Sequence, residues 1–283
     1  IVGRWLADHR ADREKVVLTT KGRFPMGNGP NDLGLSRVNL RKALDASLTR
    51  LGVDHIDLYQ MHAWDALTPI EETLRFLDDA VRVGKIGYYG FSNFLGWQLT
   101  KAVHVAKNSG FCAPVSLQPQ YNLLVRDIEF EIVPAAIDAG IGLLPWSPLG
   151  GGWLTGKYKR DETPSGASRL GTDPERGMEA YSPRNSQERT WQIIDMVQNI
   201  AQKRSASPAQ VSLAWLSAQP AVTSVILGAR NQKQLANNLA SATISLDTEE
   251  LEALDSVSKP QTSVYPYGRQ AVQQRHRSIV GGR

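Results

Sequence analysis

The feature that most constrains the fold is a regular alternation of short apolar segments with longer segments of helical period. Six apolar, β-branched segments predict strands, at 16–20, 56–61, 86–91, 115–118, 141–146 and 222–227. Eight longer segments predict helices, at 37–51, 69–83, 95–108, 130–139, 188–204, 208–218, 232–240 and 248–257. Because near-continuous apolar strands separated by helices are typical of a parallel sheet buried on both faces, the fold class is predicted to be α/β.

Residues that cap or end helices support these boundaries. Ser36 is a plausible N-cap and Gly52 a stop for the 37–51 helix. Ser207 and Gln210 form a capping box, with Pro208 at the first helical position. Residues 1–10 resemble the last turns of an amphipathic helix, so we expect a segment to be missing before them.

Polar residues at the strand ends distinguish a barrel from an open sheet. They are Thr20, Lys21, His62, Ser92, Asn93, Gln118, Ser147 and Gly228. A barrel collects the carboxyl ends of its strands at one mouth, whereas a doubly wound sheet concentrates its site at one switch point. The glycine-rich turn usual after the first strand of a doubly wound sheet is absent from the sequence. The pattern therefore favours a barrel.

Composition narrows the setting of this fold. The 283 residues fit one barrel domain over 1–283, with a long Gly-, Pro- and Ser-rich mouth loop at 155–185 and a tail at 260–283. Cys112 is the only cysteine, which favours the reducing cytoplasm. The net charge of +4 is spread along the chain, and no apolar run is long enough to span a membrane. We expect neither nucleic acid nor a membrane as a partner, and no metal site. The sequence does not indicate the oligomeric state.

Lys21 and His62 end consecutive predicted strands, in the segments VVLTTKG and IDLYQMH. Alone, such a lysine is usually a solvated strand-end charge, and such a histidine is usually structural. Their occurrence at adjacent strand ends favours a catalytic pair instead. In a mostly apolar barrel, the Lys21 ammonium would lower the pKa of a neighbouring acid.

Two further strand ends carry amide and hydroxyl groups. Ser92, Asn93 and Gln118 suit the hydrogen-bonding groups of a planar carboxamide such as that of nicotinamide. Turn chemistry for Ser92 and Asn93, and simple solvation for Gln118, are the alternatives for each residue taken singly.

The segment LLPWSPLGGGWLTGKY permits two interpretations. Gly151 to Lys157 has the glycine–lysine spacing of a phosphate-binding loop of nucleotide triphosphatases, but Tyr158 stands where that motif needs Ser or Thr. The other interpretation gives Trp146 a flat face for an aromatic ring and surrounds a pyrophosphate with the following backbone and Lys157.

A second anion site is predicted where a strand, a tight turn and a helix start follow one another in ILGARNQKQLANNL. Free amides at the helix N-terminus, together with Arg230, favour an anion. Gln234, Asn237 and Asn238 recur at helical spacing and suit a purine edge, although a solvated helix face is the alternative.

Taken together and in this order, six segments resemble the aldo-keto reductase superfamily. They are TTKG, RLGVDHIDLYQMH, GKIGYYGFSN, LQPQYN, LLPWSPLGGGWLTGKY and VILGARNQKQLANNL. The resemblance covers residues 3 to about 257 and is nearest to the branch of bacterial general-stress reductases and potassium-channel β-subunits. It implies a (β/α)8 TIM barrel and the reduction of aldehyde or ketone carbonyls to alcohols with NADPH.

The resemblance also assigns roles. Lys21 and His62 match the Lys and His of the family's Asp–Tyr–Lys–His tetrad, whereas the residues before Lys21 contain neither its Asp nor its Tyr motif. Six strands in place of eight agree with an N-terminally incomplete barrel. The absent tyrosine would donate the proton, with its pKa lowered by Lys21, while His62 orients the carbonyl oxygen.

The remaining roles concern the cofactor and substrate. The implied cofactor residues are Ser92, Asn93, Gln118, Trp146, Ser147, Pro148, Leu149, Lys157, Arg169, Gly228, Arg230, Gln234, Asn237 and Asn238. Trp64 is expected either to form the wall of the site for a small carbonyl substrate or to pack a loop. Two alternatives stay open: an NADPH-binding regulatory or partner subunit with little catalysis, and a non-catalytic remnant whose exposed strand edges pair with another chain.

Overall fold

The computed structural model describes residues 1–262 and 265–268, which divide into two compact units. Unit 1 comprises residues 1–120, 131–146 and 217–226, and unit 2 comprises 121–130, 147–216 and the chain from 227 onward. Each unit is described separately. The expected single domain over residues 1–283 stays a prediction, and most of the predicted tail at 260–283 lies outside the described residues.

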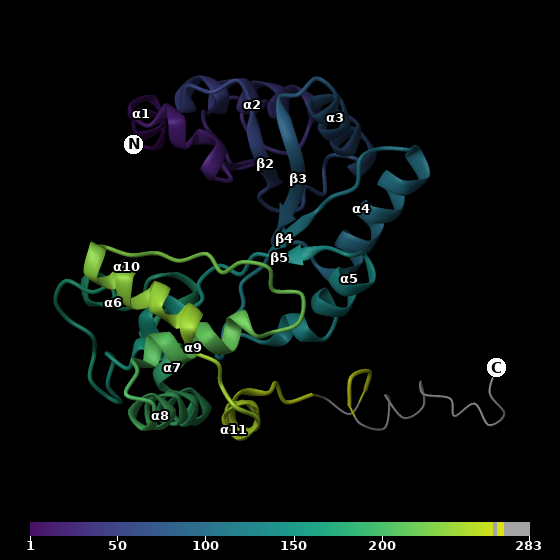
Figure 1. Cartoon of the computed structure of the whole chain (residues 1–283). Helices are drawn as coiled ribbons and strands as arrows, with labels where there is room; N and C mark the ends of the chain where they lie inside the picture. The colour runs from purple at the N-terminus through teal and green to yellow at the C-terminus, as the bar shows by residue number, and fades with distance from the viewer. Residues whose placement is uncertain (263–264, 269–283) are drawn as a thin grey trace. The chain divides into compact units, whose positions relative to one another are not determined.

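Unit 1 is an α/β unit built on a parallel sheet (Figure 1). Its strands are β1 (Thr19–Gly22), β2 (Ile56–Met61), β3 (Ile86–Ser92), β4 (Ser116–Gln118) and β5 (Gly142–Leu143). Its helices are α1 (Val2–Asp8), the 3-10 helix η1 (Arg10–Lys15), α2 (Arg37–Leu51), α3 (Ile70–Arg82), α4 (Gly96–Ser109) and α5 (Ile132–Asp138). The strands lie in chain order, β1-β2-β3-β4-β5, and every pair is parallel. The predicted α/β class with a parallel sheet is confirmed.

Unit 2 is helical in the part of the chain that the structure describes. Its elements are η2 (Asp127–Glu129), η3 (Gly150–Thr155), α6 (Arg169–Thr172), η4 (Gly177–Glu179), α7 (Tyr181–Asn185), α8 (Glu188–Lys203), α9 (Pro208–Ser217, which ends in unit 1), α10 (Gln232–Leu239), η5 (Ala240–Thr243) and α11 (Thr248–Ser258). The predicted mouth loop at 155–185 thus contains α6, η4 and α7. These short helices form because Leu170 and Tyr181 are buried against Trp153 and Trp191.

The sixth predicted strand, at 222–227, is wrong. Val222 makes only an isolated parallel bridge with Leu143, and β5 itself is two residues long rather than the predicted six. Pro145 explains part of this, because proline has no N–H to continue a ladder. Its carbonyl still accepts a hydrogen bond from the Ile226 N–H at 3.0 Å.

The predicted helix ends are confirmed where the sequence supplied a local signal. The Ser36 hydroxyl accepts a hydrogen bond from the Asn39 N–H, and Gly52 ends α2 in the left-handed conformation with φ of 67°. Ser207 and Gln210 exchange the two bonds of a capping box, at 3.3 and 2.8 Å.

The two faces of the unit 1 sheet differ in character. Tyr59, Met61, Phe91 and Leu117 alternate onto one face and are buried, and α2 to α5 follow along the sheet beside the strands (Figure 1). Toward the carboxyl ends of β1 to β4, the strand register puts on the opposite face Lys21, Gln60, Gly90, Ser92, Ser116 and Gln118. The opposite face is therefore polar toward the carboxyl ends of the strands.

Candidate active site

Lys21 and His62 lie at the carboxyl ends of neighbouring parallel strands. Lys21 is paired in register with Gln60, and the His62 N–H donates to the Gly22 carbonyl at 3.0 Å. Burial lowers the pKa of the Lys21 ammonium. Burial, and then the positive charges of Lys21 and Arg23, lower the pKa of His62. The pair thus combines a partly desolvated cation with an imidazole that favours its neutral form.

Two residues missed by the sequence analysis flank His62. The Phe24 ring meets the His62 ring edge-on, with centroids 4.5 Å apart, and the Arg23 guanidinium lies 5.1 Å from the Phe24 centroid. Arg23 Nε also donates to the Trp64 carbonyl at 3.1 Å, and its φ of 135° is strained for a residue with a side chain. Neither residue belongs to a recognisable motif, since the segment after Lys21 is irregular.

The predicted carboxamide residues form one hydrogen-bond network. Ser92 Oγ donates to the Gln118 carbonyl at 2.9 Å. The Asn93 amide donates to the His62 carbonyl at 3.0 Å and to Ser92 Oγ at 3.1 Å, while its Oδ1 accepts from Trp146 Nε1 at 3.0 Å. The network holds Trp146 and His62 to the same asparagine, which itself has a left-handed φ of 55°.

Trp64 is part of an aromatic cluster. Its ring packs edge-on against Phe94 and Trp97, each at a centroid distance of 5.3 Å. Trp64 is partly exposed, while Trp97 keeps 58% of its surface exposed. Trp97 was not singled out from the sequence, although it lies four residues after Asn93. The role of Trp64 as a substrate wall stays a prediction.

In unit 2, the segment after Trp146 has an unusual backbone. Ser147 has a φ of 54°, and Gly150, Gly151 and Gly152 all have positive φ, which suits glycine. The buried Asn122 amide donates to the Ser147 carbonyl at 2.8 Å and fixes the start of the segment. Pro148 is buried, and Leu149 is partly buried. Glycines in such a series allow an anion to approach the backbone closely.

The charges of three predicted cations act at or near Tyr158. Lys157 Nζ lies 5.0 Å from its centroid. The charges of Arg169 and Arg230 both act on the Tyr158 hydroxyl and lower its pKa, against the raising effect of burial, which dominates. Burial and then the charge of Arg230 lower the pKa of Lys157. Unit 2 therefore brings Lys157, Arg169 and Arg230 together, as an anion site requires.

The α10 region holds the rest of the predicted adenosine residues. Gly228 is exposed, and the Arg230 N–H donates to Gln234 Oε1 at 2.9 Å. Asn237 Nδ2 donates to Ser207 Oγ at 3.1 Å, and Asn238 is buried at 6% exposure. The sequence analysis missed Asn231, whose side chain caps α10 by accepting from the Gln234 N–H at 2.9 Å. Gln234 and Asn237 thus also support local structure.

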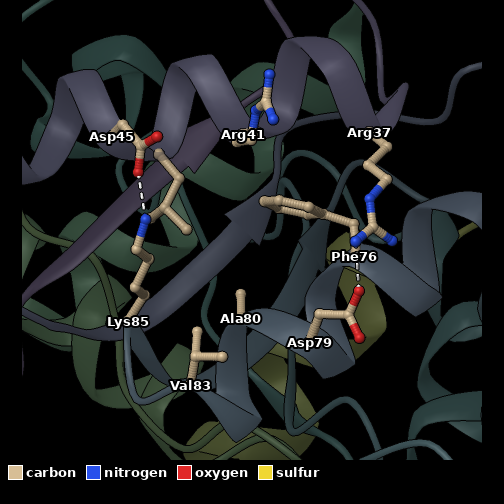
Figure 2. Close-up of a pocket in the computed structure, with 9 residues that line it drawn as sticks. Arg37, Arg41, Asp45, Phe76, Asp79, Ala80, Val83 and Lys85 are labelled. Carbon is tan, nitrogen blue, oxygen red and sulfur yellow. Dashed lines mark hydrogen bonds and ion pairs between the residues drawn. The ribbon is translucent and has the colours of Figure 1, made fainter.

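A groove on unit 1 contains none of the predicted site residues. Figure 2 shows it between α2 and α3, crossed by an Arg37–Asp79 ion pair at 2.7 Å and a Lys85–Asp45 ion pair at 2.6 Å. Its apolar lining includes Phe76. These charges tie the outer helix layer together, away from the polar face of the sheet.

A family model described as "Aldo/keto reductase family" matches residues 1–259. The chain belongs to the aldo/keto reductase family. This membership agrees with the polar strand ends that unit 1 brings together, and the family's fold is the (β/α)8 TIM barrel, of which the described residues show five parallel strands.

Several curated relatives are similar to this aldo/keto reductase over most of its length. The oxidoreductase YrpG of Bacillus subtilis is 40% identical, over 91% of this chain and 76% of the relative. A probable voltage-gated potassium channel subunit β of Oryza sativa is 35% identical, over 92% and 79%. The versiconal hemiacetal acetate reductase of Aspergillus parasiticus is 32% identical, over 94% and 80%. The family match and these relatives together show that the chain belongs to a family of oxidoreductases that reduce carbonyl groups.

Within residues 1–262 and 265–268, no helix combines the length and apolar character needed to cross a membrane.

Proposed function

We propose that this aldo/keto reductase is an NADPH-dependent carbonyl reductase that converts aldehydes or ketones to alcohols. The observation that carries the proposal is that Lys21 and His62 lie at the carboxyl ends of adjacent parallel strands, next to an amide network that includes Trp146. A partly buried cation and a neutral imidazole at adjacent strand ends suit a reaction that develops negative charge on a carbonyl oxygen.

Each of these groups has a proposed chemical role in the reaction. NADPH, when bound, supplies the hydride. The neutral His62 imidazole donates a hydrogen bond to the substrate carbonyl oxygen and orients it. The Lys21 ammonium stabilises negative charge on that oxygen and on the proton donor. The lowered pKa of His62 supports the neutral form that this role needs.

Unit 1 fits the nicotinamide end of the cofactor. Gln118 Nε2 donates to Gln60 at 2.9 Å, whereas its Oε1 accepts no hydrogen bond among the described residues and is not sealed from solvent. That oxygen suits the NH2 group of a carboxamide. Ser92 and Asn93 complete the proposed set, and the partly exposed Trp146 indole offers a face for the ring.

Unit 2 fits the phosphate-bearing end. Ser147, Pro148, Leu149, Lys157 and Arg169 are proposed for the pyrophosphate. Gly228, Arg230, Gln234, Asn237 and Asn238 are proposed for the adenosine 2′-phosphate end. The shared charge around Tyr158 supports this assignment, and the cationic Arg230 favours NADPH over NADH, which lacks the 2′-phosphate.

The reaction also needs a proton donor for the carbonyl oxygen. The family's tyrosine has no counterpart before Lys21 in the sequence, so the first test asks whether these residues suffice for turnover. Trp64, beside Phe94 and Trp97, is proposed as the substrate wall. The single cysteine favours the cytoplasm as the location.

The proposal is tested by fluorescence titration with NADPH and NADH, followed by cofactor absorbance after addition of a generic aldehyde. We expect NADPH to bind at least about tenfold more tightly than NADH, because a 2′-phosphate adds charge-assisted hydrogen bonds. Consumption of NADPH with aldehyde supports a reductase. Equal affinity for the two cofactors contradicts the NADPH assignment, and absence of binding by either contradicts the proposed function.

A second candidate is an NADPH-binding regulatory subunit with little catalysis. It is favoured by the similarity to a relative named as a probable voltage-gated potassium channel subunit β. Fold and cofactor residues do not by themselves fix the physiological role. Tight NADPH binding without turnover across a panel of aldehydes and ketones supports this candidate over the reductase.

A further inference from the structure

Gln60 is a fully buried polar residue in the middle of β2, with an exposure of 0%. It lies on the polar face of the sheet, in register with Lys21 on one side and Gly90 on the other. A buried amide in a strand is stable only if its donors and acceptors are satisfied. Its partners therefore indicate what it does.

Gln60 is hydrogen-bonded to residues of β4, one strand beyond its neighbour β3. Its Oε1 accepts from Gln118 Nε2 at 2.9 Å, and its Nε2 donates to Ser116 Oγ at 3.4 Å. A glutamine oxygen only accepts, and a glutamine nitrogen only donates. In this structure the Ser116 hydroxyl accepts, and Gln118 presents its nitrogen to Gln60 while its own Oε1 accepts no hydrogen bond among the described residues.

Gly90 makes this contact across β3 possible. It is in register with Gln60 on β2 and with Ser116 on β4, so it occupies the position between them. A Cβ atom at residue 90 would lie 2.2 Å from Ser116 Oγ and 2.6 Å from the Ser116 carbonyl oxygen. Any side chain there would displace the Gln60–Ser116 bond.

We propose that Gln60 is a positioning residue that acts across Gly90 to hold the Gln118 amide with its oxygen toward the cofactor. This orientation makes the site select a carboxamide NH2 group, a donor, over a ring substituent that offers only an acceptor. The inference rests on the proposed function, because it assumes that Gln118 meets the nicotinamide.

Without Gln60, the Gln118 amide has no partner that fixes its orientation. It can then turn its NH2 group toward the cofactor and accommodate an acceptor as well as a donor. Discrimination between the two kinds of substituent is therefore the quantity that Gln60 controls. A merely structural role for Gln60 would change stability or overall affinity and leave this discrimination unchanged.

The test measures binding of NADPH and of its 3-acetylpyridine analogue, whose methyl ketone lacks the NH2 donor. For the unmodified chain we expect NADPH to bind about tenfold more tightly than the analogue, the effect of one hydrogen bond to a buried amide. For Gln60→Met, an apolar residue of similar size, we expect the ratio to fall to about threefold or less.

Two further variants keep the test decisive. Tyr59→Phe is the matched control, because Tyr59 neighbours Gln60 on the opposite face and its buried hydroxyl has no partner among the described residues, so the ratio should stay unchanged. Ser116→Ala removes only the acceptor of Gln60 Nε2, and its ratio should fall between those of the unmodified chain and Gln60→Met. Ser116→Ala provides the answer if thermal unfolding shows that Gln60→Met does not fold.

The outcomes separate this inference from the proposed function. Tight NADPH binding with the same ratio in the unmodified chain and the folded variants overturns the role of Gln60 and leaves the reductase proposal standing. Failure of the unmodified chain to bind NADPH overturns both. A reduced ratio in Gln60→Met and Ser116→Ala, with Tyr59→Phe unchanged, supports the role of Gln60.

Discussion

The two groups of proposed cofactor residues use different physical means. In unit 1, the groups proposed for the nicotinamide end belong to a network in which Gln60 and Ser92 are fully buried and the side-chain amides are hydrogen-bonded to neighbouring residues. In unit 2, the groups proposed for the phosphate end are cations around Tyr158 and a glycine-rich backbone with positive φ. A reacting ring needs a fixed orientation, whereas a phosphate group needs charge and room for close approach.

This comparison predicts different consequences for substitutions in the two groups. Changes in Lys21 or His62 of unit 1 should affect turnover while cofactor affinity persists. Changes in the cations of unit 2 should affect affinity while turnover at saturating cofactor persists.

Lys21→Met should have the largest effect. Removing a cation next to the reacting oxygen should lower the rate of NADPH-dependent aldehyde reduction by about 100-fold or more. The dissociation constant for NADPH, measured by fluorescence titration, should change by less than about threefold, since Lys21 is not among the cofactor residues. Lys15→Met is the matched control, because Lys15 is exposed and forms an ion pair with Asp12. Unchanged turnover in Lys21→Met would remove the catalytic role proposed for unit 1.

Arg230→Ala should have an intermediate effect. Its NADPH dissociation constant should rise about tenfold, the loss of a charge-assisted contact, while that for NADH changes little. The salt dependence of NADPH affinity should also become shallower, because one exposed cation is gone. Lys233→Ala, which removes an exposed cation in the first turn of α10, serves as the control. An equal loss for both cofactors would show that Arg230 does not recognise the 2′-phosphate.

The smallest effect concerns pH and His62. Since the folded pKa of His62 is lowered, the unfolded chain binds more protons near its ordinary pKa, and the free energy of unfolding falls as the pH drops below about 6.5. His62→Gln should therefore lose less stability than the unmodified chain between about pH 7 and pH 5, by less than about 1 kcal/mol because the ring is only partly buried. Urea unfolding at both pH values measures this, with His104→Gln as an exposed control. A larger acid-induced loss in His62→Gln would contradict a neutral imidazole.

Much of the fold was predictable because its signals are local. The helix of residues 37–51 was predicted at the bounds that α2 has, since Ser36 caps it and Gly52 ends it in the left-handed conformation. The strands were less exact. The first predicted strand, at 16–20, is shifted to Thr19–Gly22, so Lys21 lies within β1 and not after it. The segment at 222–227 has strand composition but bridges β5 only at Val222.

The candidate site was predictable in its residue types and not in its contacts. Lys21, His62, Ser92, Asn93, Gln118 and Trp146 were found because polar residues stand out at the ends of apolar strands. Gln60 carried a similar signal, as the one amide inside IDLYQMH, but its partner is 58 residues away. Arg23 and Phe24 carried no comparable signal, because their relation to His62 depends on the path of an irregular loop.

The sequence by itself determined the α/β class, the positions of the main helices and the family to which this chain belongs. These properties depend on hydrophobic period, on caps and on motifs, all of which act over a few residues. The tertiary structure alone decided that Gln60 meets Gln118 across Gly90, and that Lys157 lies over the Tyr158 ring while the charges of Arg169 and Arg230 reach the Tyr158 hydroxyl. Hydrogen bonds and charges act over a few ångströms in space, so strand register and loop path decide which residues they join.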